Sequence, residues 1–162
     1  YKTMLRIIRN LVKKNDVTVL YISHDLSLLR YVCDRIGIMY QGELAELGDA
    51  DRVLNDPKPP YTQALVSAVP RANPLSTRKR LRIPDEVVSR YGGIEGCVFK
   101  NRCPYQFEKC DEKPRLVHTE EGPGPDRRVA CHLHDERVDT TVDDIDPEFE
   151  EKKEFSREDI TQ

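Results

Sequence analysis

The fold of this chain is decided by the stretch RIGIMYQGELAEL, residues 35–47. Two runs rich in apolar residues flank Gln41-Gly42, a pair that favours a two-residue turn because glycine adopts a positive φ without strain. The stretch therefore predicts a β-hairpin, with one strand over Arg35–Tyr40 and a return strand over residues 43–47.

Helical and strand-like patterns alternate before the hairpin. Residues 2–14 carry apolar side chains at helical spacing, with basic side chains on the opposite face. Residues 17–22 are apolar on both alternating faces, which is typical of a strand covered on both sides in a parallel sheet. A further helix is expected to begin near Leu26. This alternation predicts an α/β fold.

Short helices are expected after the hairpin. Asp49 is placed to cap a helix that runs through Leu54, and residues 61–69 form another amphipathic segment that Pro70 closes. From residue 71 to 90 the pattern loosens and becomes basic, as in a linker or a surface arm.

Length and charge limit what the chain can be. Its 162 residues include 26 Lys and Arg against 29 Asp and Glu, which allows one ordinary domain or two small ones and excludes a large enzyme. The longest apolar-rich run, residues 17–22, is far shorter than the roughly 20 residues of a membrane-spanning helix. Residues 135–162 carry 12 acidic and 4 basic side chains, so we expect an acidic, disordered tail.

The first candidate site is the triplet Ser23-His24-Asp25. It follows the expected strand, at the sheet edge where open α/β folds bind ligands; the alternative for His24 is a capping role at the next helix. The segments LYISHDL (20–26), VCDRIGIMYQGE (32–43) and PYTQAL (60–65) closely resemble the ATP-binding subunits of ABC importers for oligopeptides and dipeptides.

This resemblance implies a fold and a catalytic role. Residues 1–70 would be the C-terminal part of an ABC-type (P-loop NTPase) ATPase domain. His24 would be the catalytic residue that contacts the γ-phosphate of ATP, bound with Mg²⁺, and helps hold the attacking water. Ser23 and Asp25 would be orienting neighbours in the same nucleotide site. An imidazole suits this task because it donates a hydrogen bond to developing phosphate charge.

The resemblance also implies partners and a location. The parent protein would hydrolyse ATP to drive peptide import, as a peripheral protein at the cytoplasmic face of the cell membrane. Its partners would be integral membrane permease subunits, a second ATP-binding subunit and, indirectly, an extracytoplasmic peptide-binding protein. Another solute, such as nickel or a sugar, is an alternative cargo.

The nucleotide-gripping motifs of the family are missing. The phosphate loop needs Gly-x4-Gly-Lys-Ser/Thr, and the nearest match, Gly37 to Gly42 followed by Glu43, lacks the lysine and lies in the hairpin. The glutamine loop and the Leu-Ser-Gly-Gly-Gln signature are also absent. With Tyr1 in place of an initiator Met, this indicates a fragment, which by itself is expected to be inactive because phosphoryl transfer depends on those parts.

The second candidate site consists of Cys97, Cys103, Cys110 and Cys131, which provide a complete set of four thiolate ligands. The wide spacing favours a cluster over zinc, whose structural sites usually pair cysteines as Cys-x2-4-Cys. Zinc, with a histidine replacing one cysteine, remains an alternative. Cys33 lies in helical phase with apolar residues and is expected to pack in the core.

The cysteine region resembles the same importers. GCVFKNRCPY (96–105) and RVACHL (128–133) are similar to their C-terminal extension, in which some members bind a [4Fe-4S] cluster. The resemblance implies that residues 71–134 form a small irregular Cys-rich metal-binding extension, with the four cysteines holding the cluster in a structural or regulatory role.

Two other functions fit the sequence less well. An autonomous iron-sulfur or zinc module would explain the cysteines but not the segment around His24. A nucleic-acid binder that used the basic residues 71–90 is disfavoured by the net charge of -3 and by the scarcity of aromatic residues for stacking. We therefore expect no nucleic-acid partner.

Overall fold

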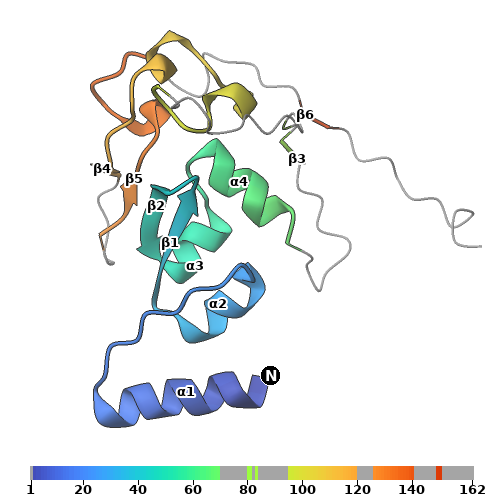
Figure 1. Cartoon of the computed structure of the whole chain (residues 1–162), viewed down its shortest axis with the longest axis vertical. Coiled ribbons are helices and arrows are strands. Elements are labelled where there is room, and N and C mark those ends of the chain that lie inside the picture. The colour runs from blue at the N-terminus through green and yellow to red at the C-terminus, as the bar shows by residue number, and fades with distance from the viewer. Residues whose placement is uncertain are drawn as a thin grey trace, which may run out of the picture.

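The computed structural model describes residues 2–69, 80–81, 83, 95–119, 126–140 and 149–150. From one end of the molecule to the other it shows a first helix, a hairpin flanked by short helices, and a segment of short turns (Figure 1). We call this last part, residues 95–119 and 126–134, the Cys-rich segment. Most of the basic arm at residues 71–90 and most of the acidic tail lie outside the described residues.

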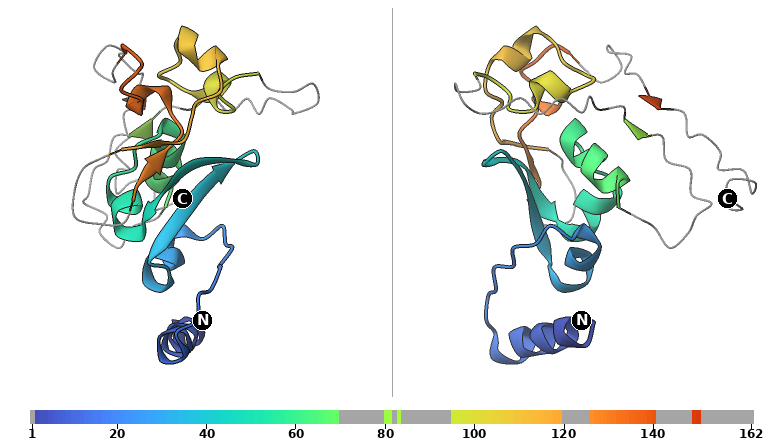
Figure 2. Two further views of the ribbon diagram at one scale, coloured as in Figure 1. Left: turned by 90° about the vertical axis from the view of Figure 1, so that its left-hand side faces the viewer. Right: turned by 45° about the vertical axis from the view of Figure 1, so that its right-hand side comes forward.

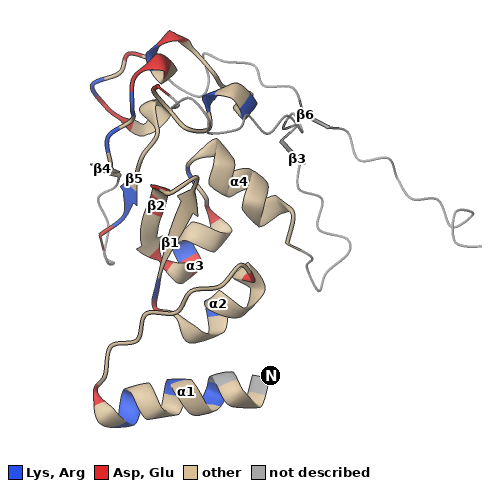
Figure 3. Ribbon diagram, in the orientation of Figure 1, with Lys and Arg blue, Asp and Glu red and all other residues tan. Residues whose placement is uncertain are grey.

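Helix α1, Lys2–Asn15, lies at one end and packs against α2, Leu26–Val32 (Figure 1). Its charged side chains are all basic, as Figure 3 shows for the helix surface. Met4, Ile7 and Leu11 of α1 are each about half exposed. The expected amphipathic helix is therefore present, and part of its apolar face is uncovered in this structure.

The prediction of a buried parallel strand at residues 17–22 is wrong for this structure. The segment has no regular secondary structure, and Leu20 and Ile22 are 87% and 89% exposed. A buried strand needs hydrogen-bonding neighbours at its edges and layers on its faces. Among the described residues every strand pair is antiparallel and none includes this segment, so nothing there covers it.

The hairpin prediction is confirmed. Strand β1, Arg35–Tyr40, pairs antiparallel with β2, Glu43–Asp49, with a register shift between Ile38 and Met39. Both turn residues have positive φ, 47° at Gln41 and 84° at Gly42. This combination matches the right-handed twist of the two strands and explains why the chain reverses in two residues.

Two short helices pack against the hairpin. Helix α3, Ala50–Asn55, is capped as expected by Asp49, whose carboxylate accepts a hydrogen bond from the Arg52 amide at 3.1 Å. Helix α4, Pro60–Ser67, begins with proline, which suits the first helical position. With α2 and β1 they enclose an apolar core, against which Cys33 packs partly buried: Leu26, Leu29, Ile36, Ile38, Ala50, Val53, Leu54 and Val66.

The Cys-rich segment continues the hairpin sheet. Strand β5, Arg128–Val129, pairs with β2, and β4, Val117–His118, pairs with β5, which gives the order β1-β2-β5-β4. Three single turns of 3-10 helix accompany them: η1, Lys100–Arg102, η2, Glu108–Asp111, and η3, His132–His134. Figure 2 shows from two further sides that this segment covers the end of the hairpin farther from α1.

A second, minimal sheet joins two distant parts of the chain. Strand β3, Arg80–Leu81, pairs antiparallel with β6, Phe149–Glu150, so that Arg80 lies opposite Glu150. The α/β class is thus correct in the coarse sense of a small mixed domain, and its sheets are antiparallel in the part of the chain that is described. No described helix is both long enough and apolar enough to cross a membrane.

Three aromatic rings join the Cys-rich segment to the hairpin and to α4. The ring centroids of Tyr40 and Tyr61 are 4.5 Å apart, and Phe99 lies 5.4 Å from each of them. Phe99 is buried and meets Tyr40 edge-on, at an interplanar angle of 89°. Such pairs add stabilisation beyond the apolar area they bury.

Replacing Phe99 with alanine is expected to lower the free energy of unfolding by about 3–5 kcal/mol, because a buried ring leaves a cavity and two unmatched aromatic neighbours. Urea denaturation measures this loss. The control is Tyr40→Phe, which keeps the ring and removes a hydroxyl 3.4 Å from the Arg102 guanidinium; it should cost below about 1 kcal/mol. Equal losses in the two variants would contradict the role of the ring cluster.

Candidate functional site

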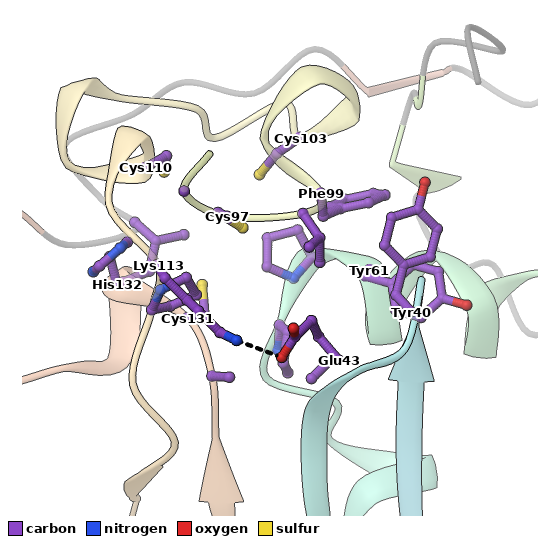
Figure 4. Close-up of a pocket in the computed structure, with 18 of the residues that line it drawn as sticks. Tyr40, Glu43, Tyr61, Cys97, Phe99, Cys103, Cys110, Lys113, Cys131 and His132 are labelled. Atoms are coloured by element: carbon purple, nitrogen blue, oxygen red, sulfur yellow. Dashed lines mark ion pairs between the residues drawn. The ribbon is translucent and has the colours of Figure 1, made fainter. Parts of the chain in front are cut away.

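The structure brings the four predicted cysteines to one cavity of about 290 Å³ between the Cys-rich segment and the hairpin. Figure 4 shows their sulfur atoms around the same hollow, with Phe99, Tyr61 and Tyr40 at its other end. The cysteines that the sequence singled out are Cys97, Cys103, Cys110 and Cys131, and all four line this cavity.

Close backbone contacts place three of these cysteines. The Cys97 amide donates to the Cys110 carbonyl at 2.9 Å, which joins the loop before η1 to η2. The Cys103 amide donates to the Lys100 carbonyl at 3.1 Å and closes η1. Gly96 has a φ of +85°, and a Cβ there would lie 2.5 Å from the carbonyl oxygens of Cys110 and Asp111. Glycine is therefore required where the two loops approach.

Burial dominates the electrostatics of the four thiols. It raises the pKa of Cys103 to about 12 and raises the pKa of the other three thiols as well. Backbone amides two residues after a cysteine act in the opposite direction: those of Phe99, Tyr105 and Leu133 lower the thiol pKa of Cys97, Cys103 and Cys131. Each of these three amides therefore favours a thiolate at the sulfur it faces.

The donor set suits a metal group in number and chemistry, because four thiols share one cavity and each of them faces a backbone amide that lowers its pKa. A single zinc ion with Zn–S bonds of about 2.3 Å would need the sulfurs about 3.8 Å apart. Within the ranges that the structure describes, no three His, Cys, Asp or Glu side chains are grouped closely enough to hold one ion.

The nearby histidines already have backbone partners. The Nε2 atom of His132 lies 2.9 Å from the Glu112 carbonyl oxygen, and Nε2 of His134 lies 3.0 Å from that of Lys58. His118 pairs through Nδ1 with Asp126. The nitrogen atoms named here are engaged, which weighs against a histidine replacing one of the cysteines as a ligand.

Basic residues near the thiols form ion pairs with acidic neighbours. Lys100 pairs with Asp111 at 3.0 Å, Lys109 with Glu112 at 2.6 Å and Arg128 with Asp126 at 2.7 Å, all with at least one exposed partner. Lys113 pairs with Glu43 at 2.8 Å on the cavity lining (Figure 4). These acidic partners offset the positive charge of the basic side chains near the thiols.

The triplet Ser23-His24-Asp25 lies away from the cysteine cavity, at the start of α2 (Figure 1). Asp25 is the N-cap, and its carboxylate accepts a hydrogen bond from the Ser27 amide at 3.0 Å. The Ser23 hydroxyl oxygen accepts one from the Asp25 amide at 3.0 Å. His24 is exposed between them. The capping role therefore belongs to Asp25, and none of the triplet lines the cysteine cavity.

A buried ion pair that the sequence did not predict joins β2 to the residue before β5, the strand that leads to Cys131. Glu46 of β2 is fully buried and Arg127 is 3% exposed. Arg127 donates to one Glu46 carboxylate oxygen from Nε at 3.0 Å and from Nη2 at 2.5 Å. The two residues are 81 positions apart, so no local spacing could have indicated that they meet.

Comparisons with known proteins agree with the resemblance described above. Residues 45–110 match the family model described as "Oligopeptide/dipeptide transporter, C-terminal region". The chain is 38% identical over 130 residues to a di/tripeptide transport ATP-binding protein, DppF, of Pseudomonas aeruginosa, and 37% identical over 114 residues to the dipeptide transport ATP-binding protein DppF of Escherichia coli. It is 37% identical over 134 residues to the oligopeptide transport ATP-binding protein AppF of Bacillus subtilis.

The matches cover most of this chain and a minor part of each relative. They include 80%, 70% and 81% of this chain, and 39%, 34% and 40% of the three relatives in the same order. The chain therefore spans 34–40% of the length of these three relatives, and its matched segment corresponds to their C-terminal region.

Replacing Gly96 with alanine is expected to destabilise the chain by at least about 2 kcal/mol, because the left-handed backbone and the overlap with two carbonyl oxygens both oppose a Cβ. Thermal or urea denaturation measures the loss. The control is Gly37→Ala, where the nearest atom is a flexible Leu44 methyl at 3.2 Å and the expected change is below about 1 kcal/mol. Similar values for both would show that the loop contact at Gly96 is not tight.

Proposed function

Since residues 45–110 match the family described as the oligopeptide/dipeptide transporter C-terminal region, we propose that this chain is the C-terminal part of the ATP-hydrolysing subunit of an ABC importer for peptides. The relatives are named as transport ATP-binding proteins for dipeptides and oligopeptides, which supports this cargo over nickel or a sugar. Its partners would be membrane permease subunits, a second ATP-binding subunit and, indirectly, a peptide-binding protein. It would act at the cytoplasmic face of the membrane.

The observation that carries this proposal is the combination of family match and uncovered apolar surface around the triplet. Met4 and Leu11 of α1, and Leu20 and Ile22 in front of the triplet, are exposed on the same N-terminal part of the chain. Exposed apolar side chains of this kind mark a surface where a partner or a further segment packs. About 60% of the length of these relatives lies outside the match, which is long enough to carry the phosphate loop and to cover these side chains.

The triplet suits a nucleotide site that is completed by that further segment. The Asp25 cap fixes the first turn of α2, and the Ser23 hydroxyl holds the Asp25 amide, so the backbone on both sides of His24 is restrained. His24 itself is exposed and free to meet a ligand. ATP with Mg²⁺ would supply the reacting phosphate, while His24 would donate a hydrogen bond to phosphate oxygen and orient the attacking water.

The complete subunit, of which we propose that this chain is the C-terminal part, is expected to hydrolyse ATP. His24→Ala should lower its kcat by roughly 100-fold, the usual cost of removing one group that stabilises transition-state charge. A steady-state phosphate-release assay measures this. The matched control is His118→Ala on β4, which lies outside the triplet and should leave turnover unchanged. Unchanged turnover in His24→Ala would contradict the role given to His24.

We also propose that the cysteine cavity holds a [4Fe-4S] cluster. Three features support it: four thiols around one cavity, the cavity's volume of about 290 Å³, and the amides of Phe99, Tyr105 and Leu133, which favour thiolate at the cysteines two residues earlier. Hydrogen bonds from amides to sulfur are a common means of tuning such clusters. The role would be structural or regulatory, because peptide import transfers no electrons.

Anaerobic reconstitution is expected to give a brown protein with about four iron and four sulfide atoms per chain. Cys110→Ser, which removes a buried cavity thiol, should lose most of the iron, whereas Cys33→Ser should retain it because Cys33 packs against the apolar core. Iron and sulfide analysis measures both variants. A colourless protein with one zinc, or equal iron loss in the two variants, would reject the assignment.

A further inference from the structure

The fourth thiol, that of Cys131, is positioned by a different part of the chain from the other three. Cys97, Cys103 and Cys110 lie in one compact stretch, where the Cys97 amide bonds to the Cys110 carbonyl. Cys131 lies 21 positions after Cys110 and enters at the end of β5 (Figure 4). Its position therefore depends on how β5 is attached to the rest of the molecule.

Backbone pairing attaches β5 to the hairpin through few bonds. Glu46 lies opposite Val129 and Leu47 opposite Arg128, and the Ala130 amide donates to the Ala45 carbonyl at 2.9 Å. A strand of two residues is marginal without further contacts. Strand β4 pairs with the other edge of β5, and the residues on either side of β5 add side-chain contacts to the hairpin region.

The Arg127 guanidinium is the deepest of these contacts. Besides its two hydrogen bonds to Glu46, its Nη2 donates to the Asp56 backbone carbonyl, and Nη1 lies 3.5 Å from the Asp56 carboxylate. A planar guanidinium can satisfy these acceptors together in one orientation only. Because both side chains are buried, any other register would leave an uncompensated charge inside the protein.

The far side of Cys131 is tied to the same loop. His134 contacts the Lys58 carbonyl through Nε2 at 3.0 Å, and the Lys58 amide faces the Glu46 carboxylate at 3.4 Å. Arg127, four residues before Cys131, and His134, three residues after it, thus both bind residues 56–58. Cys131 therefore lies between two residues that both bind the loop of residues 56–58. We call these two residues, Arg127 and His134, the anchors of Cys131.

We propose that Glu46 and Arg127 are positioning residues for Cys131: their buried pair fixes the register of β5 and so holds the fourth thiol on the cavity. The consequence for a bound cluster rests on the proposed function, whereas the positioning itself is a property of the metal-free chain. The pair also links the cavity to residues 56–58, so that loss of either anchor releases one ligand while the other three keep their places.

The test is site-resolved alkylation of the metal-free chain with iodoacetamide, with each cysteine read by mass spectrometry. In Arg127→Met, labelling of Cys131 is expected to speed up about 10-fold or more through local opening of β5, with Cys103 and Cys110 changed less than about twofold. Arg128→Met is the matched control, because Arg128 pairs with Asp126 at the surface; it should label as the unmodified chain does. Uniform acceleration at Cys131, Cys103 and Cys110 in a folded Arg127→Met chain would overturn the proposal.

The Arg127→Met chain has an unpaired buried carboxylate at Glu46, and a second variant covers the case in which this charge unfolds the chain. Glu46→Leu combined with Arg127→Met removes both charges and fills the site with apolar side chains, a replacement that folded proteins tolerate. With Cys33 still protected as a sign of an intact core, faster labelling of Cys131 supports the proposal and unchanged labelling overturns it. Metal content is measured separately: a chain that takes up no metal refutes the cluster and leaves the labelling result standing.

Discussion

The structure depends on the burial of one ion pair, Glu46 with Arg127. Glu46 lies on β2 at a position that faces the interior and is fully buried, and a carboxylate there is unfavourable unless a cation with good geometry reaches it. That cation comes from 81 residues later in the chain. Removing one partner of such a pair costs about 3–5 kcal/mol, which is a large fraction of the stability of a domain this small.

The Glu46–Arg127 pair affects both the strand order of the sheet and the loop ahead of α4. It fixes β5 beside β2 and so completes the order β1-β2-β5-β4. Arg127 also binds the Asp56 carbonyl in the loop ahead of α4, the helix that carries Tyr61 into the aromatic cluster with Phe99. One buried charge pair and one aromatic cluster thus join the Cys-rich segment to the hairpin region.

The hairpin connects the two candidate sites. Strand β1 begins three residues after α2, whose first turn carries the triplet, and it ends at Tyr40 on the cavity lining. The two sites differ in completeness. The cavity is formed by described residues of this chain from 40 to 133, whereas the triplet stands beside exposed apolar residues such as Ile22. This difference follows from the sheet: antiparallel neighbours are close in sequence or tied by side chains, while a parallel strand needs partners from distant segments.

By itself the sequence determined the local structure. The Gln41-Gly42 turn, the Asp49 cap and the core phase of Cys33 follow from φ preference, capping and helical spacing, which act over a few residues, and the structure confirms each. It also pointed to four cysteines as one set. Only the tertiary structure decided that residues 17–22 are uncovered, that Asp25 caps α2, and that Glu46 meets Arg127. Those outcomes depend on which distant segment supplies a neighbour or a counter-charge, and no periodicity within either segment encodes that choice.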